Sequence, residues 1–235
     1  MGIQVQGLSK TYGLQKAVDQ ITFNAVPGKV LGFLGPNGAG KSTTMRMLTG
    51  CLEPTAGSAR LAGFDTQTQS LEMKRILGYL PENTPVYMDM YVREFLGFVA
   101  DTYQLQNKGA KIRDVIERVG LGEEQHKKIA MLSKGYKQRV GLAQAIIHNP
   151  AILILDEPTT GLDPNQLTGI RDLVLNLGKD KTVVLSTHIM QEVDILCDQV
   201  IIINKGKIVA NSSLTDLKSK HSTDSLEEIF RCLTG

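Results

Sequence analysis

The sequence predicts an α/β fold with a mixed, mainly parallel sheet, an N-terminal antiparallel β subdomain and a helical insertion. Two observations favour this class. The run 151–155 consists of five apolar residues, as expected for a central parallel strand that is covered on both faces. From there to the C-terminus, strand-like and helix-like segments alternate, which is typical of a parallel sheet with crossover helices.

The N-terminal third is predicted to form short strands joined by turns, and Pro27-Gly28 marks the turn between the second and third strands. The predicted segments are strands at 3–5, 17–23 and 30–34, a helix at 41–49, strands at 58–61 and 76–80, and a short helix near 71–74.

Residues 85–149 form the predicted helical insertion. Apolar residues recur there at intervals of three or four, the spacing of one face of a helix, and Asn149-Pro150 ends the last stretch. We attribute these residues to core packing: Val92, Phe95, Leu96, Val99, Ile112, Val115, Ile116, Val119, Leu142, Ala145 and Ile146. A chain of this length can bury a full core, so we expect one domain over 1–235. Its core covers about 1–84 and 150–235, and its helical subdomain covers about 85–149.

In the second half of the chain, a helix is predicted to begin at Asp163-Pro164, with Asp163 as the N-cap and the proline in the first turn. This helix buries Leu167, Ile170, Val174 and Leu177. The remaining predicted segments are a strand at 182–185, a helix at 189–196, a strand at 200–203, a turn at 204–207 leading into 208–209, and packing helices at 214–219 and 226–233.

A glycine-rich motif lies between the predicted strand 30–34 and the helix that follows it. It has the pattern of a phosphate-binding loop, Gly, four residues, Gly-Lys-Ser, and this strand–loop–helix context is the one the motif requires. A plain glycine-rich turn before a helix is the alternative, and eight matched positions disfavour it. The sequence therefore predicts the core of a P-loop nucleoside triphosphatase, with nucleotide-binding residues Gly35, Pro36, Asn37, Gly38, Ala39, Gly40, Lys41, Ser42 and Thr43.

Each part of this loop suits a phosphate. Glycines allow backbone N–H groups to approach phosphate oxygens, and the start of the next helix directs its positive dipole end at the same charge. Lys41 is expected to reach the β- and γ-phosphates, while the Ser42 hydroxyl is expected to ligate Mg²⁺.

Two acidic residues, Asp156 and Glu157, follow the apolar run 151–155 directly. An acid at the end of a buried strand beside a phosphate loop is placed to hold Mg²⁺, which we expect of Asp156. Glu157, one position on, is expected to polarise the attacking water. His188 follows the strand 182–185 near the same sheet edge, where ligands bind in open α/β folds. From spacing alone a structural role for His188 stays open, and the other histidines are assigned structural roles.

Composition excludes several classes of function. The net charge of +2 and the sequence pI near 8.4 fall short of a dedicated nucleic-acid binder. No apolar run approaches the ~18 residues that span a bilayer, and the first residues lack a signal peptide's apolar core. Cys51, Cys197 and Cys232 are odd in number and far apart, which indicates a reducing cytoplasm and no disulfide framework.

The segment 132–139, Leu-Ser-Lys-Gly-Tyr-Lys-Gln-Arg, lies between the phosphate loop and the acidic pair. Together with Tyr12, Asp156-Glu157-Pro158-Thr159, Gly161-Leu162-Asp163-Pro164 and His188, it resembles the ATP-binding cassette family over essentially the whole chain. Within that family the chain is similar to ATPase subunits of exporters whose membrane domains are separate chains. The Leu-Ser-Lys-Gly-Tyr form is similar to the multidrug, sodium-export and gliding-motility groups.

The resemblance implies further roles. Tyr12 would stack on adenine, Glu157 would be the general base, and His188 would contact the γ-phosphate. Ser133, Lys134, Gly135 and Asp163 would face the ATP held by a second cassette. A serine at the start of a helix is also an ordinary N-cap. Without the family resemblance, this interpretation of Ser133 stays open.

Two positions depart from the family pattern. Lys134 and Tyr136 replace the glycine and glutamine of the usual Leu-Ser-Gly-Gly-Gln. Lys134 would either add positive charge near the phosphate or face solvent. Glu82 replaces a glutamine, keeps an oxygen for Mg²⁺ and loses an amide donor.

The expected function is an ATP-hydrolysing subunit that powers an ABC transporter, of the exporter type, through ATP-driven pairing of two cassettes. Its expected cofactors are ATP and Mg²⁺, and its expected partners are a second cassette and separate transmembrane permease subunits, without nucleic acid. It would be cytoplasmic and peripheral on the inner face of the membrane. The alternatives are a soluble ATPase of this superfamily acting on DNA or ribosomes and a regulatory module that no longer hydrolyses ATP.

Overall fold

The computed structural model describes residues 2–221, 223 and 225–235. Among these residues, six strands form the central sheet in the order β10-β9-β3-β8-β7-β6. All neighbours are parallel except β10, which pairs with β9 in antiparallel fashion, so the predicted mixed, mainly parallel sheet is confirmed. The strands are β3 (Lys29–Leu34), β6 (Leu77–Leu80), β7 (Ile152–Asp156), β8 (Thr182–Thr187), β9 (Gln199–Asn204) and β10 (Lys207–Ser213).

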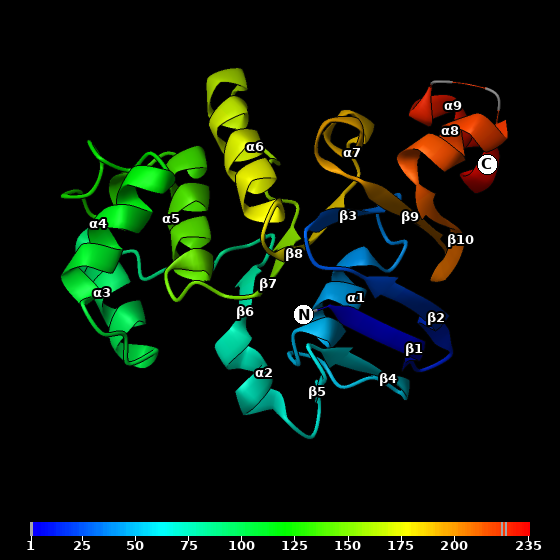
Figure 1. Cartoon of the computed structure of the whole chain (residues 1–235), viewed down its shortest axis with the longest axis horizontal. Helices are drawn as coiled ribbons and strands as arrows, with labels where there is room; N and C mark the ends of the chain where they lie inside the picture. Colours follow the sequence, from blue (N-terminus) through cyan, green and yellow to red (C-terminus); the bar gives the residue numbers. More distant parts are fainter. Residues whose placement is uncertain (1, 222, 224) are drawn as a thin grey trace.

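A second sheet, which is antiparallel, lies beside the central one (Figure 1). Its strands follow the order β2-β1-β4-β5 in the part of the chain that is described. They are β1 (Ile3–Tyr12), β2 (Gln15–Ala25), β4 (Ala56–Leu61) and β5 (Phe64–Asp65). The predicted N-terminal antiparallel β subdomain is thereby confirmed.

Helices cover the sheets and build the insertion. Helices α3, α4 and α5 stand together at one end of the molecule, and α8 and α9 lie near the C-terminus at the other end (Figure 1). The helices are α1 (Lys41–Leu48), α2 (Ser70–Ile76), α3 (Val92–Thr102), α4 (Lys108–Arg118), a 3-10 helix (Ile129–Met131), α5 (Lys134–Ile146), α6 (Pro164–Gly178), α7 (Met190–Leu196), α8 (Leu214–His221) and α9 (Leu226–Thr234).

The central sheet is buried on both faces, as the continuous apolar run in β7 predicts. Successive side chains of a strand point to opposite faces, and β7 supplies one core from each face. Leu153 and Leu155 belong to the core with the helical insertion and α6. Ile152 and Ile154 belong to the other core, between the two sheets and around α1. The strand is thus held rigidly on both sides, and its C-terminal end carries the acidic pair.

Several element boundaries differ from the sequence expectation. The strand predicted at 3–5 extends to Tyr12, because irregular pairing beyond Val5 keeps β1 attached to β2. The strand predicted at 76–80 begins one residue later, since Ile76 ends α2. The strand predicted at 182–185 continues to Thr187, so Ser186 lies within β8. This last difference matters for the site.

Candidate active site

The phosphate loop connects β3 to α1 and depends on glycine at two positions. Gly40 has φ 107°, a conformation that L side chains rarely adopt, and a Cβ there would lie 2.5 Å from the carbonyl oxygen of Ala17. A Cβ on Gly35 would lie 2.5 Å from the carbonyl oxygen of Ile203. The loop is therefore packed against backbone on both sides, and its shape excludes any side chain at these positions.

Lys41 is the first residue of α1, and its side chain folds back into the loop. Its Nζ donates to the carbonyl oxygens of Gly35 (2.8 Å) and Pro36 (3.2 Å). The residue is only 6% exposed, and burial lowers the pKa of its ammonium, while the charges of Glu157 and Asp156 oppose this shift. The loop thus carries a buried cation beside two carboxylates.

Asp156 ends β7 and is buried. Its Oδ1 accepts hydrogen bonds from the hydroxyl of Ser186 and from Ser42 Oγ, the latter at 3.3 Å. Burial raises the pKa of the Asp156 carboxyl, and the two serine hydroxyls partly offset this effect. Two elements, α1 and β8, therefore fix the orientation of this carboxylate.

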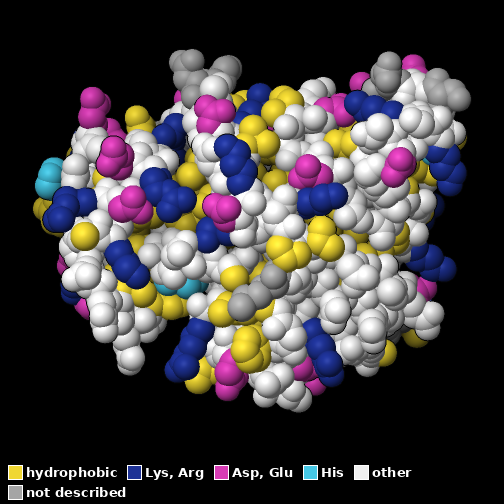
Figure 2. Space-filling view, viewed as in Figure 1, with side chains coloured by type: hydrophobic (Ala, Val, Ile, Leu, Met, Phe, Trp, Pro, Cys, Tyr) yellow, Lys and Arg dark blue, Asp and Glu magenta, His cyan; other side chains and the backbone are white. Residues whose placement is uncertain are grey.

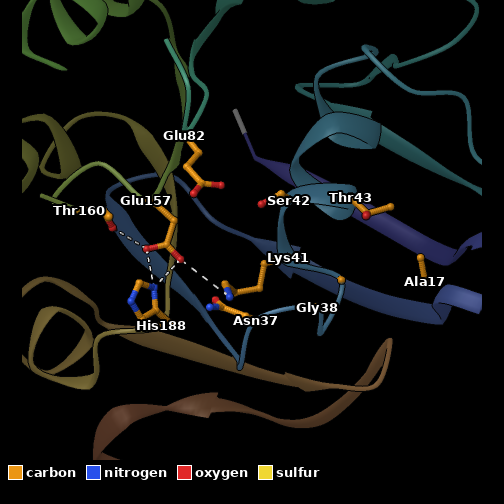
Figure 3. A pocket seen from close by; sticks show the side chains of 11 residues that line it. Ala17, Asn37, Gly38, Lys41, Ser42, Thr43, Glu82, Glu157, Thr160 and His188 are labelled. Carbon is orange, nitrogen blue, oxygen red and sulfur yellow. Dashed lines mark hydrogen bonds and ion pairs between the residues drawn. The ribbon is translucent and has the colours of Figure 1, made fainter. Parts of the chain in front are cut away.

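Glu157 stands one residue further, at a backbone φ of 52°, which directs its side chain away from that of Asp156. Its carboxylate accepts a hydrogen bond from Thr160 Oγ1 (3.0 Å), and Oε2 lies 2.9 Å from His188 Nδ1. Its Oε1 lies 3.8 Å from Lys41 Nζ. Figure 3 shows these side chains converging, with Glu82 on the opposite side of Glu157 from His188.

These groups surround a cavity of about 510 Å³. It is lined by Ala17, Asn37, Gly38, Gly40, Lys41, Ser42, Thr43, Glu82, Glu157, Thr160 and His188. Most of the predicted phosphate-loop and catalytic residues thus meet at one place. Gly35 and Ala39 are buried within the loop itself, and Asp156 lies behind Ser42.

Tyr12 and the segment beginning at Ser133 lie outside this lining. Tyr12 ends β1, is 49% exposed, and has Lys10 Nζ 5.5 Å from its ring centroid. Ser133 is the N-cap of α5 and accepts from the backbone N–H of Tyr136 (3.3 Å). Asp163 is the N-cap of α6, as predicted, and accepts from the N–H of Gln166. Each stays exposed at the surface.

Sequence reasoning missed Ser186, Thr160 and Ala17. Ser186 pairs directly with Asp156 across the parallel strands β8 and β7, so strand register is the signal that would have found it. Thr160 follows Glu157 by three residues and can therefore reach back to it across the turn. Ala17 is brought to the cavity by the β2 backbone, for which the sequence holds no local signal.

No group of three or more His, Cys, Asp and Glu side chains is placed to hold a metal ion in the described ranges. Mg²⁺ commonly uses only one or two carboxylates and takes its other ligands from substrate phosphates and water. The oxygens of Ser42, Asp156 and Glu82 have the hard donor chemistry that this ion prefers.

Comparison with known proteins decides the family. The sequence profile described as ABC transporter matches residues 18–160. The chain belongs to the ABC transporter family. It is 40% identical over 221 residues to the bacitracin transport ATP-binding protein BcrA of Bacillus licheniformis, covering 93% of this chain and 72% of BcrA. It is 35% identical over 230 residues to the linearmycin resistance ATP-binding protein LnrL of Bacillus subtilis, covering 97% and 74% of the two chains.

Solved structures agree with this assignment. A structure described as the ATP-binding subunit of an ABC transporter superposes with a TM-score of 0.92 and 28% identity, covering 100% of both chains. A dimeric cassette in a post-hydrolysis state, MJ0796 bound to ADP and Pi, has the same fold with a TM-score of 0.83 and 22% identity. It covers 90% of this chain and 98% of its own. This ABC protein is an ATPase subunit of a transporter, and within the described residues no helix has both the length and the apolar character needed to cross a bilayer.

Proposed function

We propose that this ATPase hydrolyses ATP in the cavity beside Lys41 and that hydrolysis powers an exporter. The observation that carries the proposal is that Lys41, Glu157 and His188 line one cavity and contact one another through Glu157, with Asp156 bonded to Ser42 of the same lining. A buried cation, a carboxylate and an imidazole within hydrogen-bonding or ion-pairing distance are the groups that phosphoryl transfer to water requires.

The roles follow from position. The loop from Gly35 to Thr43 would hold the phosphates, and Lys41 would contribute its charge to them. Glu157 would accept the proton of the attacking water, because its carboxylate faces the cavity and is held by Thr160. His188 is 44% exposed and reaches both Glu157 and the cavity, so it would contact the γ-phosphate.

The oxygens of three residues at this site suit Mg²⁺. Ser42 Oγ lies 3.3 Å from Asp156 Oδ1, and Ser42 and Glu82 both line the cavity. We propose Ser42, Asp156 and Glu82 as the residues that hold the ion, directly or through water. When bound, Mg²⁺ neutralises charge on the terminal phosphates.

A second cassette would complete the ATP site. Ser133 is the exposed N-cap of α5 and places its hydroxyl at the positive end of the helix dipole, which favours an anion from outside the chain. We propose that Ser133, Gly135 and Asp163 face the nucleotide of the other copy, and that Tyr12 stacks on adenine. The pairing could involve two identical or two different cassettes, and each forms a single ATP-binding domain.

The export role rests on the relatives. One is named for bacitracin transport and another for linearmycin resistance, and the chain spans about three-quarters of each. Separate permease chains would hold the cassette at the inner face of the membrane. Figure 2 shows Lys and Arg side chains interspersed with Asp and Glu on this face of the molecule, and the net charge of the chain is only +2, so we propose no nucleic-acid partner.

The substitution Glu157→Gln tests the catalytic role. It keeps the size of the side chain and removes the base, so we expect ATP hydrolysis to fall at least about a hundredfold while Mg²⁺-dependent ATP binding persists. Phosphate release and binding of a fluorescent ATP analogue measure the two quantities. Glu72→Gln, an exposed position on α2, is the matched control and should hydrolyse at the parental rate.

Hydrolysis by Glu157→Gln at the parental rate would remove Glu157 from the proposed mechanism. A loss of ATP binding in the same variant would instead indicate that Glu157 supports the shape of the phosphate loop.

Fractionation of cells that produce the chain with its own membrane partners tests the transport role. We expect most of the chain to sediment with salt-washed membranes and to return to the soluble fraction when the permease chains are omitted. Sedimentation with ribosomes or DNA under both conditions would support the soluble ATPase instead.

A further inference from the structure

Two segments of the chain, the first turn of α5 and the loop before α6, contact each other at two glycines. Gly161 lies in the loop between β7 and α6, and Gly135 lies in the first turn of α5. A Cβ on Gly161 would lie 2.6 Å from Lys134 Nζ and 3.0 Å from its Cε. A Cβ on Gly135 would overlap the side-chain amide of Gln166, in the first turn of α6. Each helix start thus places a side chain over the other's glycine.

The loop that Lys134 covers is the catalytic loop, residues 157–163. It begins at Glu157, and Thr160 donates to the Glu157 carboxylate from inside it. Gly161 has φ 78°, so the loop turns sharply directly under the lysine side chain. A displacement of the loop at Gly161 would therefore move the adjacent Thr160 and change the hydrogen bond that Thr160 donates to Glu157.

The position of Lys134 needs an explanation. A cation in the first turn of a helix is unfavourable, because it meets the positive end of the helix dipole, and the first turn of α5 holds no acidic residue. Lys134 forms no ion pair with any residue in the described ranges. The Lys134 atoms nearest to the Cβ position of Gly161 are Nζ, Cε and Cδ, so the end of the side chain, ammonium group included, lies against the glycine.

We propose that Lys134 and Gln166 are positioning residues that clasp the start of α5 to the catalytic loop of the same chain. This inference rests on the proposed function, in which the start of α5 meets the ATP of a second cassette. Contact with that ATP would then be transmitted through Lys134 and Gly161 to the loop that carries Glu157.

Lys134→Ala in the otherwise unchanged chain removes the contact with Gly161. We expect kcat for ATP hydrolysis to fall about tenfold, because the loop that orients Glu157 is less constrained, while KM for ATP changes less than about twofold. Lys134→Met retains most of the stem without the charge and should recover most of the lost kcat. Lys137→Ala, one turn along on α5, is the matched control and should keep the parental kcat.

A double-mutant cycle with Gly161→Ala isolates the contact. The backbone strain of an alanine at φ 78° is common to both backgrounds, whereas the contact of the added methyl group with Lys134 exists only in the parental chain, so Gly161→Ala should lower kcat less in Lys134→Ala. Equal effects in both backgrounds would overturn the clasp, as would a parental kcat for Lys134→Ala. Equal losses for the Ala and Met variants would overturn it in favour of a charge contact with phosphate.

ATP hydrolysis by the parental chain distinguishes a failure of this inference from a failure of the proposed function. If parental protein lacked Mg²⁺-dependent ATP hydrolysis, the proposed function would fail and the cycle would have no baseline. If it hydrolyses ATP and the cycle shows no coupling, only the clasp is wrong.

Discussion

His188 and His148 carry the same side chain but have different properties, because their surroundings differ. His188 is 44% exposed and contacts the catalytic carboxylate. His148 is half-buried, stacks on Tyr103 with ring centroids 3.9 Å apart, and has its Nε2 3.0 Å from the carbonyl oxygen of Leu77. Burial lowers the pKa of His148 to about 4, while the hydrogen bond to Leu77 opposes the shift. The folded chain therefore keeps this ring neutral.

His148 makes the stability of the fold depend on pH. Its pKa is lower in the folded chain than the ordinary 6.5, so below pH 6.5 the unfolded chain binds more protons. The stabilising effect is complete above pH 6.5 and is lost as the pH falls towards 4. Between pH 7 and pH 5 we expect His148 to lower the free energy of unfolding by about 2 kcal/mol. Urea denaturation at both pH values measures this change in the free energy of unfolding.

His148→Gln should remove this part of the pH dependence, because glutamine keeps an amide donor and does not titrate. His126→Gln is the control, since His126 is exposed, and should leave the difference unchanged. An unaltered pH dependence in His148→Gln would show that other groups cause it.

For single residues, the sequence predicts the catalytic and phosphate-binding side chains better than it predicts the side chains that hold them in place. Lys41, Asp156 and Glu157 belong to local motifs, so spacing is sufficient to predict that Lys41 and Glu157 line one cavity and that Asp156 lies beside Ser42. Ser186 and Thr160 hold two of these groups in place, but Ser186 reaches Asp156 only through the register of β7 and β8. Register depends on the packing of the whole sheet, and no local pattern encodes it.

At the scale of elements, periodicity predicts the buried segments well and the edges poorly. The strand β7 and the helices α3, α4 and α5 are recognisable because their buried residues follow a regular spacing. The strand β1 runs seven residues beyond its predicted end, from Val5 to Tyr12, through irregular pairing that disturbs the alternation. The short strand β5 and the 3-10 helix were not predicted, because two or three residues hold too little pattern.

At the scale of the whole molecule, Ser133 and Asp163, which begin α5 and α6, are exposed and lie outside the cavity beside Lys41. ATP bound at Lys41 would contact Ser133 of the partner subunit, so ATP should favour the dimer over the monomer. We expect Glu157→Gln with Mg²⁺ and ATP to sediment at twice the monomer mass, because hydrolysis no longer removes the γ-phosphate. Analytical ultracentrifugation measures this.

Adding a chelator should return the Glu157→Gln dimer to monomer, and Ser133→Arg should prevent its formation by filling the contact. A monomer at saturating Mg²⁺ and ATP would contradict the head-to-tail pairing.

The turn between β9 and β10 lies far along the sequence but touches the phosphate loop. The backbone N–H of Gly206 donates to the carbonyl oxygen of Ala39 (3.0 Å), and Gly206 in turn accepts from the N–H of Asp19 (2.9 Å). During synthesis, a growing chain that has not yet reached Gly206 lacks this brace. The loop therefore reaches this hydrogen-bonded arrangement only after the chain has been made as far as Gly206 and the turn between β9 and β10 has folded against Ala39, so nucleotide capture has to wait for a segment more than 160 residues downstream of the loop.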